Sequence, residues 1–400
     1  MYMKAPKLRF KADDGSKFPD WEEKVFGDFV DTHLEKTSDK DKYPLYSLTI
    51  ESGVQPKTDR YEREFLVKKE GDNYKIVPPN AFVYNPMNLR FGALKVNHEK
   101  FSVSVSGYYD VFSLKDDSVL AFWENYLVTP KMLNYYFSIA TGSLIEKLRV
   151  HYSQFVKIKK PLPSLQEQQK IAEFLSTIDT VIEKQKETVS AWEERKKGVM
   201  QKLFSQEVRF KADDGSQFPD WEEKKLSEMF KKIIEKDRLD LPPLTIVQGY
   251  GTIRRDKSER RITYDEKGLR NYKAVQKDDF IVHLRSFEGG LEIANQDGIV
   301  SPAYHVYRGN SKIYPPFYYP YFRSSSFIKS KLATCVSGVR DGKNIEKESF
   351  DELLIPYPCL AEQQKIADCL SSLDDVIAKQ KATLATWEEL KKGLLQQMFI

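Results

Sequence analysis

Residues 161–186 read PLPSLQEQQKIAEFLSTIDTVIEKQK, and residues 356–381 read PYPCLAEQQKIADCLSSLDDVIAKQK. The similarity continues to residues 204 and 399, with 26 identities over 44 positions at an offset of 195. Each copy opens with two prolines, then has no further proline and a single late glycine. Because proline stops a strand and is tolerated at a helix start, each copy predicts one long helix.

Hydrophobic residues recur along both copies with the heptad spacing of a coiled coil. The predicted seam residues are Ile171, Leu175, Ile178, Ile182, Gln185 and Trp192 in the first copy, and Ile366, Leu370, Leu373, Ile377, Gln380 and Trp387 in the second. Glutamine and lysine layers fall at matching places, which would fix the register. The simplest partner of each helix is therefore the other one. The alternative, two helices packed separately on their own domains, leaves the matching polar layers unexplained.

The order of the segments favours an antiparallel helix pair. A helix of roughly 35 residues is about 52 Å long. Each helix follows a globular segment, so antiparallel pairing would place the two globular domains at opposite ends of a rod, related by a pseudo-twofold axis. Parallel pairing would crowd both domains at one end.

A second repeat precedes each globular segment. Residues 8–24 read LRFKADDGSKFPDWEEK, and residues 208–224 differ from them at only two positions. The chain thus divides into a lead-in repeat, a first domain, a first helix, a connector repeat, a second domain and a second helix. Their predicted ranges are 1–24, 25–160, 161–204, 205–224, 225–355 and 356–400.

The two domains read as mixed α/β segments with little mutual similarity. Strand-like runs are Phe82–Tyr84, Phe101–Val105, Tyr108–Phe112, Val119–Phe122, Phe280–Leu284, Ile299–Val300 and Tyr304–Tyr307; helical candidates are Lys131–Ile139 and Tyr318–Lys331. Weak matches pair Leu48-Thr49-Ile50 with Leu244-Thr245-Ile246, and Asn73-Tyr74-Lys75 with Asn271-Tyr272-Lys273. We predict one shared fold with two different surfaces.

Composition narrows the class of protein. The 400 residues carry a net charge of +4, so the overall charge does not by itself indicate nucleic acid. No stretch approaches the roughly 18 apolar residues of a membrane helix, and the first residues lack the apolar core of a signal peptide. Three cysteines without metal-type spacing indicate reduced thiols. We expect a cytoplasmic protein with no membrane partner.

Catalytic motifs are missing or incomplete. Asp20, Glu22 and Lys24 resemble a nuclease signature, but their spacing cannot place them on adjacent strands. A duplicated turn that packs Phe18 and Trp21, with Phe218 and Trp221 in the second copy, is the simpler interpretation. Asn85-Pro86-Met87 lacks the stacking aromatic of amino-methyltransferases, and no phosphate-binding loop is present. Five scattered histidines predict no metal site. We predict a binding protein without catalytic residues, cofactor or metal.

Local clusters of basic residues suggest DNA contacts. Residues 254–261 read RRDKSERR, and such stretches suit phosphate neutralisation. Arginine can also read guanine, and Asn344 or Gln248 could read adenine. The predicted DNA-binding residues are Lys57, Arg60, Arg63, Arg90, Arg254, Arg255, Lys257, Arg260, Arg261, Arg285, Arg340 and Asn344. A solvated charged loop is the alternative interpretation for each of them.

With the repeats, the helices and the absent catalysis together, the chain resembles the specificity subunits of type I restriction–modification systems. The resemblance covers essentially the whole chain and is carried by the proline-led helix starts, which are complete from Pro161 through Ile171 and from Pro356 through Ile366. The segments KDDFIV (277–282) and SPAYHV (301–306) are similar to strands of the family, whereas the first domain departs from them with PNAFVY and SGYYDV.

The resemblance implies two target-recognition domains that each read one half of a bipartite gapped site in double-stranded DNA. The coiled coil would set the spacing and dock two methyltransferase subunits. It also implies that S-adenosylmethionine, ATP and Mg act in those partners and in restriction subunits that translocate DNA, and not in this chain. The rival hypotheses are a coiled-coil scaffold that binds only proteins, and a nuclease that uses Asp20, Glu22 and Lys24.

Overall fold

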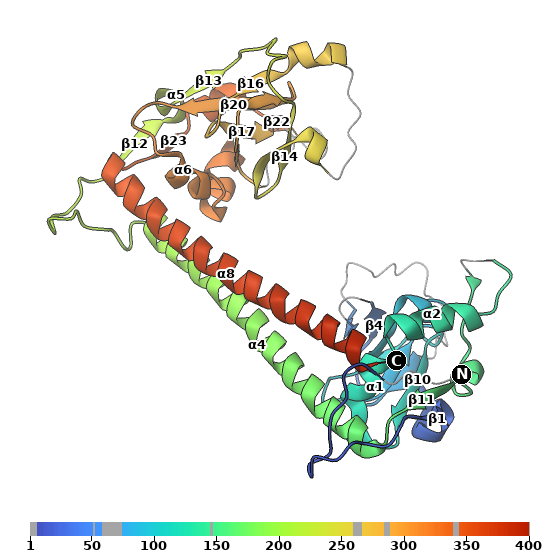
Figure 1. Ribbon diagram of the computed structural model, residues 1–400. Helices are drawn as coiled ribbons and strands as arrows, with labels where there is room; N and C mark the ends of the chain where they lie inside the picture. The colour runs from blue at the N-terminus through green and yellow to red at the C-terminus, as the bar shows by residue number, and fades with distance from the viewer. Residues whose placement is uncertain are drawn as a thin grey trace. The chain divides into compact units, whose positions relative to one another are not determined.

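The computed structural model describes residues 6–50, 53–57, 74–144, 147–258, 266–283, 289–338 and 344–399. The chain divides into two compact units (Figure 1). The first unit joins Met1–Thr188 to Lys381–Ile400, and the second is Val189–Gln380. Two long helices, α4 (Leu165–Phe204) and α8 (Leu360–Met398), each contribute one part to each unit. Each unit therefore holds a domain, the start of the helix that follows it, and the end of the other helix.

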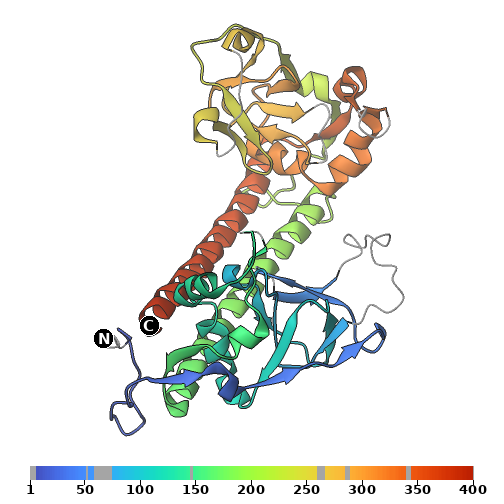
Figure 2. The same ribbon diagram turned by 90° about the vertical axis from the view of Figure 1, so that its right-hand side faces the viewer.

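The domain of the first unit is built on two antiparallel sheets. A four-stranded sheet has the order β2-β10-β7-β8, with strands at Val30–His33, Asp110–Leu114, Phe82–Tyr84 and Leu94–Val96. A three-stranded sheet has the order β3-β6-β9, with strands at Lys36–Thr37, Tyr74–Val77 and Val103–Val105. Figure 2 shows these strands, coloured blue to teal, beside the green helix α4. The small pairs are β1–β11 (Glu22–Val25 with Lys159–Leu162) and β4–β5 (Tyr46–Thr49 with Gly53–Pro56).

Short helices close the core of the first unit. They are α1 (Leu120–Tyr126), α2 (Pro130–Ile139) and α3 (Tyr152–Phe155), with 3-10 turns η1 (Phe26–Phe29), η4 (Leu89–Phe91) and η5 (Asp117–Val119). Aromatic side chains dominate this core, including fully buried Phe26, Phe112 and Trp123. Large rings provide much buried apolar area and pack edge to face, as Phe26 and Trp123 do at 5.2 Å between centroids.

The second unit repeats this topology. Its four-stranded sheet has the order β13-β20-β17-β18, with strands at Phe230–Ile233, Tyr304–Gly309, Phe280–His283 and Glu292–Ile293. The other strand pairs are β12–β23 (Glu222–Lys225, Leu354–Tyr357), β14–β15 (Leu244–Val247, Gly251–Arg254), β16–β19 (Lys273–Val275, Gly298–Val300) and β21–β22 (Val336–Ser337, Asn344–Ile345). The remaining elements are α5 (Leu226–Met229), α6 (Pro315–Phe322), α7 (Lys347–Asp351), the π-helical η9 (Phe327–Lys331), and the 3-10 turns η7 (Arg255–Lys257), η8 (Glu266–Asn271) and η10 (Leu332–Cys335).

The structure corrects three sequence-based assignments. Val119–Phe122 is not a strand, because Asp116 caps a turn that continues into α1 and the buried Phe122, Trp123 and Tyr126 follow helical spacing. The helix expected at Tyr318–Lys331 starts earlier, at Pro315, and is interrupted before η9. Pro315 fits the first helical turn, which needs no N–H donor there.

The third correction concerns the weak match between the two domains. Leu45 bridges Ser104, and Pro243 bridges Ile299, at the same place of the two folds. Leu244-Thr245-Ile246 therefore corresponds to residues 46–48, two residues before the run that the sequence matched. The shared fold class is confirmed: two mixed α/β domains of one strand order stand on a pair of long helices.

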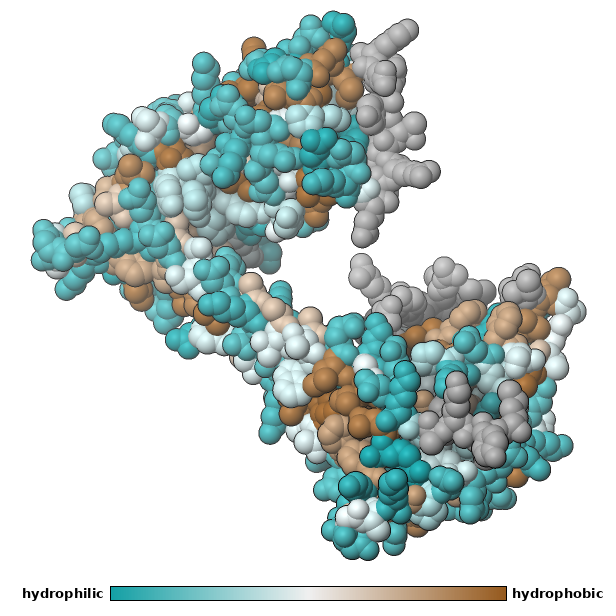
Figure 3. All heavy atoms as spheres, in the orientation of Figure 1, coloured by the Kyte–Doolittle hydropathy of each residue, from teal (hydrophilic) through white to brown (hydrophobic). Residues whose placement is uncertain are grey.

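The two long helices are antiparallel. In the first unit, the end of α8 lies against the domain that precedes α4, where Phe399 packs on Phe122 and Tyr126. In the second unit, the end of α4 takes the matching place, and Phe204 packs on Phe317 and Tyr321. Figure 3 shows hydrophobic residues, in brown, gathered on the first unit where the end of α8 lies beside α1 in Figure 1.

Candidate nucleic-acid interface and its scaffold

The seam of the helix pair follows the heptad pattern. Near the domains most of its residues are buried, with exposed fractions from 0% at Leu175 to 7% at Ile377, and Leu373 is half-buried. Toward the middle, Gln185, Trp192 and Gln380 are half-buried. The seam is thus most buried next to each domain, where residues such as Leu175 and Leu370 also belong to the core of the domain.

Two ion pairs at matching positions bridge the helices. Lys391 on α8 donates to Asp179 on α4 at 2.5 Å in the first unit. Lys196 on α4 donates to Asp374 on α8 at 2.5 Å in the second unit. Lysines in the seam can extend their apolar stems along it while the ammonium group reaches a carboxylate of the facing helix. The lysine layer of the sequence is thus a pair of interhelical bridges.

A buried carboxylate joins each lead-in repeat to the start of its helix. Arg9 binds both oxygens of Glu167, at 2.9 and 2.7 Å, and Trp21 donates its indole N–H to the same group at 3.2 Å. Arg209 and Trp221 bind Glu362 in the same way in the second unit. Glu167 and Glu362 are fully buried, and their hydrogen bonds raise the pKa of the two arginines.

This arrangement accounts for the similarity of the two repeats. The arginine and tryptophan of the lead-in contact the glutamate of the helix motif. A second contact joins Asp13 to Lys170 at 2.5 Å, and Asp213 to Lys365 at 2.6 Å. In each unit, one partner of these contacts lies in the lead-in repeat and the other lies in the repeated start of the long helix. Both repeated segments are therefore needed to form the junction.

The nuclease-like residues do not converge on one site. The Asp20 side chain is fully exposed beside Arg9, at 3.6 Å, while Lys24 pairs with Glu22 at 2.5 Å on the strand β1. In the described part of the chain, no group of three or more histidine, cysteine, aspartate or glutamate residues could hold a metal ion. Among the same residues, no helix is both long and apolar enough to cross a bilayer.

The predicted DNA-binding residues of the first domain are placed unequally. Lys57 is exposed after β5. Arg90 is buried in η4, where its guanidinium lies 4.7 Å from the ring centroid of Phe91 and 5.8 Å from that of Phe137. Its burial supports a packing role more than a base contact. Arg60 and Arg63 lie outside the described residues.

In the second domain, Arg254 and Lys257 are exposed, and Arg254 binds Asp256 through two hydrogen bonds of 3.2 and 2.8 Å. Arg255 lies over the Tyr272 ring at 5.4 Å and donates to the Tyr272 hydroxyl at 3.3 Å. Asn344 is exposed on β22. The remaining predicted residues, Arg260, Arg261, Arg285 and Arg340, lie outside the described residues.

The tip of the β14–β15 hairpin is a built feature of the second domain. The buried Glu292 accepts hydrogen bonds from the Gly249 N–H at 2.8 Å and the Tyr319 hydroxyl at 3.0 Å, and it also binds Arg323. This network supports an exposed tip with Gln248 and Tyr250, the latter 63% exposed. A pocket of about 190 Å³ lies beside Gln248. Gln248 could be identified from the sequence, but its support could not, because Glu292 and Arg323 are far from it in the chain.

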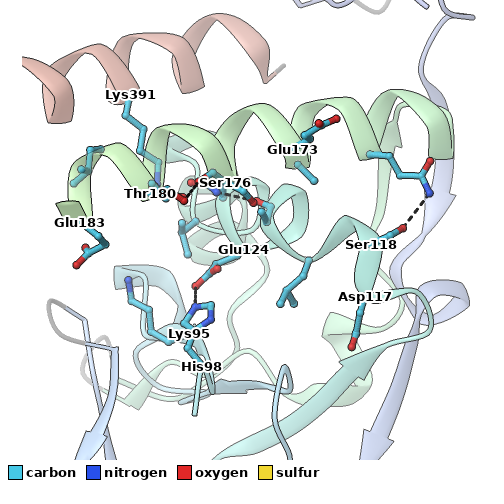
Figure 4. A pocket seen from close by; sticks show the side chains of 18 of the residues that line it. Lys95, His98, Asp117, Ser118, Glu124, Glu173, Ser176, Thr180, Glu183 and Lys391 are labelled. Carbon is cyan, nitrogen blue, oxygen red and sulfur yellow. Dashed lines mark hydrogen bonds and ion pairs between the residues drawn. The ribbon is translucent and has the colours of Figure 1, made fainter. Parts of the chain in front are cut away.

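A wide groove of about 1220 Å³ opens on the first unit between β8, α1 and α4 (Figure 4). His98 and Glu124 face each other across 3.0 Å on one side, and Ser176 and Glu183 of α4 line the other. The hydrogen bond to Glu124 raises the pKa of His98 above its usual value. Carboxylates outnumber the lysines in the lining, and such a mixed and mainly acidic surface suits a protein partner better than a DNA phosphate.

Comparison with known proteins gives a consistent result. A family model described as the type I restriction modification DNA specificity domain matches residues 19–190 and again residues 219–386. The MjaX type I restriction enzyme specificity subunit of Methanocaldococcus jannaschii is 28% identical over 267 residues, which cover 63% of this chain and 60% of that protein. The MjaVIII specificity subunit of the same organism is 29% identical over 264 residues, covering 60% and 61%.

This chain thus matches less than two thirds of the length of these curated relatives. The similarity in fold covers more of the chain than the similarity in sequence. The crystal structure of a type I restriction–modification S subunit from M. genitalium superposes with a TM-score of 0.53 at 15% identity, covering 99% of each chain. Two family matches together span most of this sequence. The chain belongs to the family of type I restriction–modification DNA specificity domains and carries two copies of the domain.

Proposed function

We propose that this protein is the DNA sequence-specificity subunit of a type I restriction–modification complex. Each domain reads one half of a bipartite gapped site, and the helix pair sets the distance between the halves. The single observation that carries the proposal is the internal contrast of the chain. Two domains of one strand order differ in their surface residues, while the segments that hold them on the helices are nearly the same.

That contrast fits recognition better than catalysis. A reader of two different half-sites needs two different surfaces in one fixed frame, whereas an enzyme needs convergent catalytic groups. Phosphate contacts would position each domain, and base contacts would specify its half-site. Exposed polar tips such as Gln248 and Tyr250 are suited to a DNA groove, where glutamine can bind adenine with two hydrogen bonds.

The duplicated scaffold also suggests the partners. The repeated junctions offer equivalent surfaces in both units, which suits two copies of a methyltransferase subunit. These partners would supply S-adenosylmethionine and flip an adenine from the duplex for methylation. Restriction subunits would add ATP and Mg for translocation and cleavage. We place the assembly in the cytoplasm, where it would act on incoming phage DNA.

The test is a genome-wide map of N6-methyladenine. Cells would express the modification subunit of the same system with this chain, without it, or with an unrelated specificity subunit that shows the modification subunit to be active. We expect a gapped, asymmetric motif that appears only with this chain. If the unrelated subunit directs methylation and this chain directs none, the proposal is wrong and a protein-only scaffold becomes the better interpretation.

A further inference from the structure

The strand register allows the two domains to be compared residue by residue. Thr32 lies opposite Phe112 in the first domain, and Lys232 lies opposite Tyr307 in the second. The same strands align Asp110 with His305, since each stands two residues before the aromatic residue. The position of Thr32 in the first domain is thus taken by a lysine in the second, and that of Asp110 by a histidine.

Two further positions are lysine in both domains. Lys75 lies opposite Val105 on β9, and Lys273 lies opposite Val300 on β19. Lys36 and Lys236 are also equivalent, because the carbonyls of Glu35 and Glu235 accept the matching N–H groups of β6 and of β16. The domains therefore share two basic positions at this end of the sheets and differ at two neighbouring ones.

In the first domain the positive charge of Lys75 is neutralised by an aspartate. Lys75 donates to Asp110 at 3.0 Å, and both side chains are largely buried, at 10% and 23% exposed. The Thr32 hydroxyl donates to the Tyr152 hydroxyl at 2.7 Å. The pair of Lys75 with Asp110 satisfies the charge locally, so no external anion is required there.

In the second domain the corresponding lysines have no carboxylate partner within ion-pair distance among the described residues. Lys232 lies 3.3 Å from Nδ1 of His305, and Lys273 donates to the carbonyl oxygens of Pro302, at 3.0 Å, and Tyr304. All three side chains are half-buried. The second domain has His305 where the first has Asp110, so it lacks the counter-ion of the lysine. It also has Lys232 where the first domain has Thr32, which adds a positive charge.

Burial and neighbouring lysines disfavour the charged form of both ammonium groups. Burial is the main cause of the lowered pKa of Lys232 and of Lys273. Lys347 lowers the pKa of Lys232 further, while Asp351 and Glu348 act in the opposite direction, and Lys232 and Lys236 lower the pKa of Lys273 further. Burial, followed by Lys232 and Lys273, lowers the pKa of His305 to about 4. Crowded and partly desolvated ammonium groups without a counter-ion are unfavourable, and an anion bound between them would relieve that cost.

We propose that Lys232, His305 and Lys273 form a contact site for a backbone phosphate of DNA, present in the second domain and absent from the first. The site rests on the proposed function, because it assumes that the domain binds DNA. It adds affinity without sequence information, since a phosphate is common to every nucleotide. The two domains would then differ in their electrostatic contribution as well as in the bases they read.

The test transfers the pattern of the first domain to the second. The full chain, assembled with its modification subunits, would carry Lys232→Thr together with His305→Asp. Its dissociation constant for duplex DNA would be measured over a series of KCl concentrations. We expect binding to weaken roughly tenfold at 0.1 M salt, and the slope of log K against log salt to fall in magnitude by about 1. The methylated motif should not change, because no base contact is removed.

A matched control removes one exposed lysine elsewhere in the domain, with Lys329→Thr, and should leave the slope as in the wild type. Equal affinity and slope for the double variant and the wild type would overturn the phosphate site while leaving DNA recognition intact. A wild-type complex that binds DNA no better than the modification subunits alone would instead contradict the proposed function.

A second measurement separates DNA phosphate from free phosphate. The His305 ring would be followed by NMR in the assembled complex as DNA or inorganic phosphate is added at constant ionic strength. A shift with DNA and none with millimolar phosphate supports the backbone contact. A shift with inorganic phosphate combined with unchanged DNA binding by the double variant would assign the site to a free anion and overturn the proposal.

Discussion

Lys391 on α8 and Asp179 on α4 form an ion pair of 2.5 Å between two helices whose sequences nearly repeat each other. Lys196 and Asp374, which are their equivalents after exchange of the helices, form the same pair at 2.5 Å. The lysine side chains are 23% exposed in both cases. Antiparallel pairing makes this possible, because only then does each lysine meet the aspartate of the other copy.

The first prediction concerns these bridges. Asp179→Lys should destabilise the helix pair of the first unit, because it places two positive charges at contact distance. Adding Lys391→Asp should restore most of the loss. A double-mutant cycle on thermal unfolding should give a coupling of about 0.2–1 kcal/mol, as for partly exposed pairs. The pair Lys196 and Asp374 should give a similar value, and a coupling near zero in both cycles would show that the bridges do not hold the register.

The junction of Arg9 with Glu167 should contribute much more. Glu167→Ala removes the carboxylate that binds the Arg9 guanidinium and leaves the Trp21 N–H without its acceptor, and we expect a loss of about 3 kcal/mol in the free energy of unfolding. Glu167→Gln keeps an acceptor and should cost less. Glu362→Ala provides the matched variant in the second unit, and Glu194→Ala on the exposed face of α4 serves as the control. Denaturant unfolding measures each, and a loss at Glu167 no larger than at Glu194 would contradict the junction.

The two domains should respond to pH in opposite directions. The hydrogen bond to Glu124 raises the pKa of His98, so its contribution to stability is present below about pH 6.5 and fades as pH rises through the raised value. Burial lowers the pKa of His305 to about 4, so stability is lost as pH falls from about 6.5 to that value. NMR titration of the two rings, with His98→Gln and His305→Gln for assignment, measures both shifts. Titration of both rings near pH 6.5 would contradict this account.

Gly290 tests the support of the β14–β15 hairpin. Its φ is +80°, and a Cβ atom there would lie 2.2 Å from the carbonyl oxygen of Phe322. Gly290→Ala should cost about 2–4 kcal/mol of stability through backbone strain and displacement of Phe322. Gly268→Ala is the control, since its Cβ would meet nothing within 4 Å. Equal unfolding midpoints for the two variants would show that the tip tolerates rearrangement.

Exchange of one domain tests whether each domain reads its own half-site independently of the other. Replacing residues 225–355 with the corresponding segment of another specificity subunit should change one half of the methylated motif. The other half and the spacer should stay as they were, because the first domain and the helices are untouched. Methylome sequencing provides the measurement. A change in both halves would mean that the domains do not read independently.

The helices could be predicted from the sequence because their signal is local and periodic. Proline stops, heptad spacing and duplicated polar layers all lie within one continuous segment. The antiparallel direction also followed, since it depends only on the order of segments along the chain. Local patterns were less reliable where two periodicities compete, as at Val119–Phe122, where a cap at Asp116 favours a helix.

Side-chain contacts between residues that are distant in the chain could not be predicted from such local patterns. Arg90 looked like an exposed base reader in the sequence, yet Phe91 and Phe137 enclose its guanidinium. Lys232, Lys273 and His305 are more than 30 residues apart from one another along the chain, and no local pattern joins them. Lys232 meets His305 because β13 pairs with β20, whereas Lys273 comes from the separate pair β16–β19. In the first domain, Lys75 on β6 likewise meets Asp110 on β10 from a different sheet.

The duplicated scaffold, the direction of its helices and the presence of two divergent domains could be predicted from the chain alone, because periodicity and repetition are properties of the sequence. Which charges are paired and which lack a counter-ion became evident only in the folded domains. Charge pairing depends on distances between strands that are remote in sequence, and a single replacement such as Asp110 by His305 reverses the outcome while the fold stays the same.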